Sequence, residues 1–224
     1  MIEADPSWSA RWPGAQAGFL ALQNVSNPGL CPPLESRKQA LENELRLHFG
    51  AENAAALPGW GPLPAYASFY HAFDKTYHVL GQLKSVAVKG KAIPSVAALV
   101  EAMFIAELHN GLLTAGHDLA RVSGTVRIAA AQGGETYLGL RGETLTLKPG
   151  DMYIADQVGI LSSILGGPDG RTPIQADTQA VLFTVYAPAG IPQAAVQAHL
   201  DEIYTLVHLI SPQASLLYKQ ILSA

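Results

Sequence analysis

The chain has 224 residues, of which 49% are hydrophobic and 14% are charged, and its formal net charge is −4. This composition is typical of one large globular domain or two closely packed lobes. Nonspecific nucleic-acid binding depends on Lys and Arg neutralising phosphates, so the charge excludes a generally polybasic nucleic-acid-binding protein. Any RNA contact would need a local basic patch or a specific contact.

Cys31 is the single cysteine, which excludes an intramolecular disulfide and a cysteine-based metal site. The sequence has no Walker loop and no dinucleotide fingerprint, and no cofactor is predicted. It also shows no apolar signal core and no stretch long enough to cross a bilayer, so the expected location is the cytoplasm, with no membrane partner.

The N-terminal half combines one strand with helices. Residues 17–25 form a predicted buried strand, and an apolar stripe over 34–49 predicts a helix. Aromatic residues at three- and four-residue spacing predict further helix from residue 66 on, with the rings in the core, followed by a short helix over 82–89. His71 and His78 lie off that stripe and are expected at the surface.

A nearly continuous apolar run over 96–108, preceded by a capping Ser95, predicts a helix that is buried on all sides. Glu107 is near its end and is expected to reach water. Glu101 is mid-helix and must be paired, hydrogen-bonded or protonated. Two interpretations of Glu101 remain open: a structural acid that caps a loop or meets an Arg, and a site acid with a raised pKa. A C-cap at 109–111 and a loop over 112–118, rich in reactive side chains, are expected next.

The C-terminal half changes to short strands, at 125–130, 135–140, 144–147, 151–155, 159–165 and 180–187. A glycine-rich turn at 166–170 follows the strand at 159–165. Helices are predicted over 191–210 and 213–222. Helices and strands are segregated along the chain. The sequence therefore predicts an α+β fold, with a mixed, largely antiparallel sheet packed with helices around the buried central helix.

We expect a single domain over 1–224. It comprises an N-terminal strand and helix extension (1–65), a core (66–190) and C-terminal helices (191–224).

Residues 93–187 carry an ordered set of short motifs with characteristic spacing. They are Gly90–Ser95, Val100-Glu101, His117-Asp118, Gly124–Ala129, Gly134–Thr136, Ile154–Asp156, Ile164–Gly167 and Asp177–Leu182. This set resembles the B3/B4 module of the bacterial phenylalanyl-tRNA synthetase β subunit and its free-standing relatives. The resemblance implies a B3/B4-like core. In the synthetase this module is an editing domain, which hydrolyses the ester bond of tyrosine wrongly attached to the phenylalanine tRNA, so the resemblance also implies an aminoacyl-tRNA ester hydrolase.

The family's site uses a His after the central helix, a Gly in the Gly-Gly turn and a Glu on the following strand. On an ungapped register the His position is Ala115 and the Glu position is Thr184, whereas Gly166 and Gly167 are kept. Ala115 and Thr184 cannot act as bases. The resemblance therefore implies a retained pocket with altered chemistry.

The candidate residues follow from this comparison. The catalytic candidates are His117, Glu101 and His109. The substrate-binding candidates are Thr114, Ala115, Asp118, Gly166, Gly167 and Thr184.

Three functions remain open at this stage. The first is a tRNA-linked protein, either an editing hydrolase acting in trans on aminoacyl-tRNA or its non-catalytic relative. The second is a binding protein for a small aromatic amino-acid-like molecule. The third, a metal-dependent enzyme using His109, His117 and Asp118, matches no known metal-ligand spacing. No class-defining synthetase motif is present, which excludes a complete aminoacylating enzyme. A basic approach to residues 166–170 would favour tRNA, and a mainly apolar pocket without one would favour a small ligand.

Overall fold

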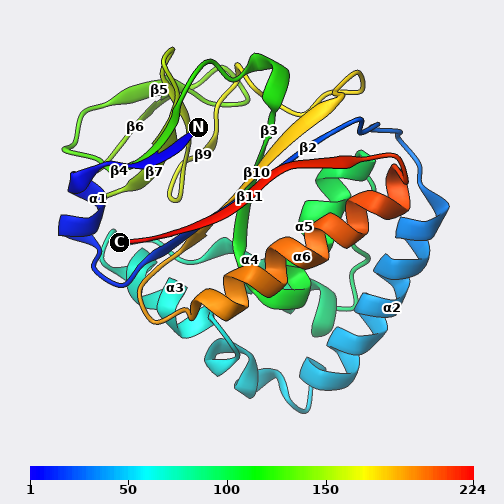
Figure 1. Cartoon of the computed structure of the whole chain (residues 1–224). Coiled ribbons are helices and arrows are strands. Elements are labelled where there is room, and N and C mark those ends of the chain that lie inside the picture. Colours follow the sequence, from blue (N-terminus) through cyan, green and yellow to red (C-terminus); the bar gives the residue numbers. More distant parts are fainter.

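Two main sheets and a set of helices make up the structure, a computed structural model that describes residues 1–224 (Figure 1). The helices are α1 (Pro6–Arg11), α2 (Pro32–Phe49), α3 (Leu63–His71), α4 (His78–Ala87), α5 (Ala98–Asn110) and α6 (Gln193–Ile210), with 3₁₀ helices η1 (Ala54–Gly59) and η2 (Leu119–Arg121). The strands are β1 (Ile2–Ala4), β2 (Gln16–Gln23), β3 (Leu113–Asp118), β4 (Val126–Ala130), β5 (Thr136–Leu138), β6 (Thr144–Thr146), β7 (Met152–Ala155), β8 (Ile160–Ser163), β9 (Gly167–Pro168), β10 (Ala180–Ala187) and β11 (Ser215–Ser223). The predicted α+β class is confirmed.

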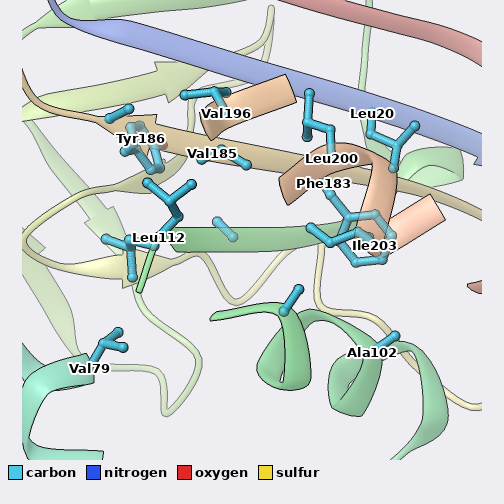
Figure 2. Close-up of a cluster of buried hydrophobic side chains, with 14 of the residues drawn as sticks. Leu20, Val79, Ala102, Leu112, Phe183, Val185, Tyr186, Val196, Leu200 and Ile203 are labelled. Carbon is cyan, nitrogen blue, oxygen red and sulfur yellow. The ribbon is translucent and has the colours of Figure 1, made fainter. Parts of the chain in front are cut away.

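The first sheet has the strand order β11-β2-β10-β3, and every neighbouring pair is antiparallel. Helices α5 and α6 pack against each other and against this sheet (Figure 1). Figure 2 shows Val196 and Leu200 of α6 beside Val185 of β10 in the core. A Cβ at Gly18 of β2 would lie 2.7 Å from Val196 Cγ1, so glycine allows the helix to approach the strand this closely.

The second sheet has the order β1-β4-β7-β8-β9, in which only β1 and β4 are parallel. Trp8 of α1 is fully buried and donates through Nε1 to Met152 Sδ at 3.3 Å. The predicted glycine turn, residues 166–170, begins in the connection from β8 to β9 and includes the short strand β9 itself. Gly167 has a φ of +81°, which glycine adopts without strain. No helix combines the length and the apolar character that a membrane crossing requires.

The central helix α5 begins at Ala98, and its first turn is capped from elsewhere in the chain. Asn27 Oδ1 accepts from the Leu99 amide at 2.9 Å, and the Glu101 carboxylate accepts from the Val96 amide at 2.8 Å. The predicted cap, Ser95, instead accepts from Lys38 Nζ at 2.7 Å. The helix ends at Gly111, whose φ of +70° provides the predicted C-cap.

Replacing Asn27 with alanine is expected to destabilise the protein by about 1–2 kcal/mol, because the buried Leu99 amide loses its acceptor. Urea denaturation measures this change in the free energy of unfolding. Asn53→Ala is the matched control, since Asn53 is exposed and makes no side-chain hydrogen bond to its helix. Equal stability of the two variants would contradict the capping role.

Three sequence-based expectations about the elements are wrong. Residues 113–118 form β3 rather than a loop, and 215–223 form β11 rather than a helix. Strand β3 pairs with β10 and β11 pairs with β2. This long-range pairing orders the expected loop as a strand and overrides the local helical spacing of residues 213–222. The aromatic segment forms two helices, α3 and α4, separated at 72–77, although its rings are buried as predicted.

Candidate functional site

A cavity of about 400 Å³ lies where α4, α5, β3 and the β8–β9 turn meet. Its lining is mixed, with apolar walls and a few polar groups. The lining residues are His78, Gln82, Val100, Met103, Phe104, Glu107, Leu113, Thr114, Ala115, Ser163, Ile164, Leu165, Gly166, Gly167, Pro168 and Tyr186. Lys and Arg are absent from this lining.

The cavity also explains why one face of α5 is only partly buried. The sequence predicts a helix buried on all sides, yet Val100, Met103 and Phe104 are only half-buried, because they form the cavity wall. The helix therefore separates the core from the cavity.

Glu107 is the acidic group of this cavity. The expectation that it reaches bulk water is wrong, because the residue is 3% exposed. Its Oε1 accepts from the Thr114 amide at 2.7 Å. Burial raises the pKa of the carboxyl to about 8, although the Thr114 hydrogen bond lowers it in part. At neutral pH, without a cation beside it, this carboxyl group is thus mainly protonated.

The unfolding free energy of the wild type, relative to that of Glu107→Gln, is expected to fall as pH rises from about 4.5 to about 8. The folded-state pKa exceeds the ordinary value, so the contribution is complete below the unfolded pKa and is lost as pH rises through the folded pKa. The difference in unfolding free energy should change by up to about 1.4 kcal/mol per pH unit within this window. Chemical denaturation across the pH range measures it. Parallel curves for the two proteins would contradict the buried, protonated state.

His78 and Gln82 are one turn apart on α4, and both line the cavity. His78 is exposed at the mouth, and partial desolvation lowers its pKa from 6.5, so it is neutral at pH 7. Gln82 Oε1 is buried and has no hydrogen-bond partner. Neither residue was singled out from the sequence, where His78 was assigned to the surface because it lies off the aromatic stripe.

The structure brings four of the predicted substrate-binding residues to the cavity: Thr114, Ala115, Gly166 and Gly167. Thr184 is the cross-strand partner of Ala115 and is fully buried, with Oγ1 lacking a hydrogen-bond partner. The two positions that the resemblance aligns with the family's His and Glu, Ala115 and Thr184, are thus neighbours across two strands. Asp118 lies away from the lining, where it caps η2 and accepts from Thr178 Oγ1 at 3.1 Å.

His117 is fully buried between the two sheets and does not line the cavity. Its Nδ1 lies 2.8 Å from Thr172 Oγ1, and its Nε2 lies 3.1 Å from Ser162 Oγ. Ser162 in turn contacts the hydroxyl of Tyr186, a lining residue, at 2.8 Å. Burial lowers the His117 pKa to about 3, so the imidazole stays neutral. His117 therefore reaches the cavity only through this chain of hydrogen bonds.

The other two predicted catalytic residues also lie outside the cavity lining. Glu101 is buried and pairs with Lys38 Nζ at 2.8 Å, which corresponds to the structural interpretation, with Lys in place of the anticipated Arg. His109 is half-buried and pairs through Nδ1 with Glu202 at 2.8 Å, which raises its pKa. No group of three His, Cys, Asp or Glu side chains is arranged to hold a metal ion.

The B3/4 domain family model matches residues 65–204, which include every residue that lines the cavity. The chain belongs to the B3/4 domain family. This B3/4 protein is similar to the phenylalanine–tRNA ligase β subunit of Cereibacter sphaeroides, with 48% identity over 52 residues, and to that of Paramagnetospirillum magneticum, with 41% identity over 71 residues. These matches cover 22% and 31% of this chain but only 6% and 9% of the two relatives.

A solved structure shows the same relation at the level of the fold. An N-terminal fragment of the phenylalanyl-tRNA synthetase β subunit from Pyrococcus horikoshii superimposes with a TM-score of 0.51 at 13% identity. The match covers 99% of this chain and 50% of the fragment. The B3/4 protein is thus related to the synthetase β subunit through this module, and its span is a small part of the curated relatives.

Proposed function

We propose that this B3/4 protein acts on aminoacyl-tRNA in trans, binding the aminoacyl end in the cavity and hydrolysing its ester bond. The observation that carries the proposal is the cavity itself, which lies within the matched family span and combines apolar walls, a buried carboxyl group and an imidazole. The relation to phenylalanyl-tRNA synthetase β subunits supports an aromatic aminoacyl group, such as tyrosine mischarged on the phenylalanine tRNA.

The arrangement of the lining supports this assignment. Met103, Phe104 and Ile164 provide apolar surface for an aromatic side chain. Lys75 donates to the carbonyl of Leu165, a lining residue, at 3.0 Å, and Lys148 donates to Phe73 at 2.9 Å. Both lysines are exposed. They are the cations that we assign to the phosphates of an incoming tRNA end.

His78 is the group that we assign as general base. Its neutral imidazole nitrogen takes a proton from a water molecule as that water attacks the ester carbonyl carbon. The bond from this carbon to the ribose oxygen then breaks, and the proton passes to that oxygen. The products are the free amino acid and uncharged tRNA. His117 acts only through Ser162 and Tyr186 in this scheme, whereas Glu101 and His109 support α5.

Deacylation of tyrosyl-tRNA(Phe) by the purified protein tests the proposal. Hydrolysis faster than the buffer control, and faster than that of phenylalanyl-tRNA(Phe), is the expected result. Unchanged half-lives of both charged tRNAs at saturating protein, without a mobility shift of the tRNA at low salt, would exclude the tRNA-directed function.

The absence of Lys and Arg from the lining favours a second candidate, a binding protein for a small aromatic amino-acid-like molecule. A thermal shift with such ligands, in a protein that leaves charged tRNA intact, would support this alternative over hydrolysis.

A further inference from the structure

The hydrogen-bonding groups of the cavity are unevenly distributed between acceptors and donors. Glu107 receives one hydrogen bond from the protein, from the Thr114 amide, and Gln82 Oε1 is a buried acceptor with no partner. Glu107 of α5 and Gln82 of α4 both line this cavity, and the two helices contact each other. Buried acceptors without partners are costly, so a ligand that supplies donors at this place is favoured.

The surroundings of Glu107 contain no group that could neutralise it. The nearby phenols are Tyr66, Tyr70 and Tyr77. Each hydroxyl donates elsewhere: Tyr66 to the Tyr186 carbonyl, Tyr70 to Ile164 at 2.6 Å and Tyr77 to Gly111 at 3.0 Å. No Lys or Arg lines the cavity. Without a cation Glu107 stays mainly protonated. A ligand ammonium group stabilises the ionised carboxylate, and the carboxyl proton passes to solvent.

The glycine turn offers little to an anion. The Gly166 amide donates to Ser163 Oγ at 2.9 Å, and the Leu165 amide donates to Asp151 Oδ1 at 3.3 Å. These two amides are therefore already used inside the protein. A free amino acid brings a carboxylate as well as an ammonium group. Once the ammonium group has ionised Glu107, that second carboxylate lies in a cavity with no cationic side chain to balance it.

We propose that Glu107 and the Gln82 carbonyl form an amine subsite, so that the cavity takes amino acids whose carboxyl group is esterified or amidated and rejects free amino acids. This inference rests on the proposed function and deepens it, because an aminoacyl-tRNA has a free ammonium group and an esterified carboxyl. The lack of a cationic partner for a ligand carboxylate also favours release of the free amino acid, because hydrolysis of the ester creates that carboxylate.

Isothermal titration calorimetry with three probes tests the subsite: tyrosinamide, tyrosine and 3-(4-hydroxyphenyl)propionamide, which lacks the amine. Tyrosinamide is expected to bind at least tenfold more tightly than either of the other two. In Glu107→Gln, which keeps an acceptor for the Thr114 amide, tyrosinamide should lose this advantage over the desamino amide. Binding of the desamino amide should persist, and this shows that the variant is folded.

The outcomes separate the two proposals. Tyrosine that binds as tightly as tyrosinamide would overturn the proposed selectivity, although the proposed aminoacyl-tRNA function would stand. Its carboxylate would then have a partner, such as the first turn of α4, which no side chain caps. An undiminished preference of Glu107→Gln for tyrosinamide overturns the role of Glu107. Failure of all three probes to bind the wild type overturns both the subsite and the proposed function.

Discussion

Replacing Lys38 with methionine is expected to destabilise the protein by about 3–5 kcal/mol, since it leaves a buried carboxylate without its cation. Lys38 Nζ of α2 lies 2.8 Å from the Glu101 carboxylate of α5, and each side chain is only 3% exposed. The same ammonium group also contacts Glu35 at 2.5 Å and Ser95 at 2.7 Å. The loss should appear as a lower urea midpoint.

The double variant Lys38→Met/Glu101→Gln is the control. Glutamine can still accept from the Val96 amide, as Glu101 does, but it carries no charge that needs Lys38. We expect the double variant to recover most of the lost stability. If it is as unstable as Lys38→Met alone, the loss arises from packing of the lysine stem rather than from the unpaired charge.

Replacing His78 with alanine is expected to lower the single-turnover rate of tyrosyl-tRNA(Phe) deacylation by about 100-fold or more, the usual range for a general base. His78 is the only histidine in the cavity lining. The affinity for the charged tRNA should change little, because the apolar walls and the lysines remain. His71→Ala is the matched control, since His71 is exposed on the neighbouring helix α3 and does not line the cavity.

The pH profile distinguishes a base from a structural role. In the wild type the rate should rise with pH as His78 loses its proton, with an inflection below the ordinary histidine pKa, because desolvation lowers the pKa of His78. The His78→Ala variant should lose this inflection. Equal losses in the His71 and His78 variants, or an unchanged profile, would contradict the assignment.

Most of the elements could be predicted from sequence, because each has a local signal. The apolar run of α5, the stripe of α2 and the β-branched run of β10 were predicted close to their observed bounds. The strands β3 and β11 were not predicted correctly, because their conformation depends on partners far along the chain. Residue 113 pairs with 186, and residue 215 pairs with 23.

The candidate site was less predictable for the same reason. The family resemblance pointed to Thr114, Ala115, Gly166 and Gly167, and all four line the cavity, whereas their role in binding stays a prediction. Glu107 lies near the end of a helix, a place that ordinarily reaches water, and its burial depends on tertiary packing that local sequence does not show. For His117 the sequence predicted a catalytic residue in a loop. In the structure its two ring nitrogens are hydrogen-bonded to Thr172 and Ser162 within the core.

The central claim, that the cavity binds the aminoacyl end of a tRNA, can be tested through methionine methyl groups. The chain has three methionines, of which Met103 lines the cavity, Met152 is fully buried elsewhere and Met1 is 82% exposed. Protein labelled with ¹³C at the methionine methyls is titrated with 3′-tyrosylamino-3′-deoxyadenosine, whose amide bond resists hydrolysis. We predict a saturable shift of the Met103 signal, with Met152 and Met1 unchanged. A Met103 signal that stays in place, or three signals that move together, would contradict the account.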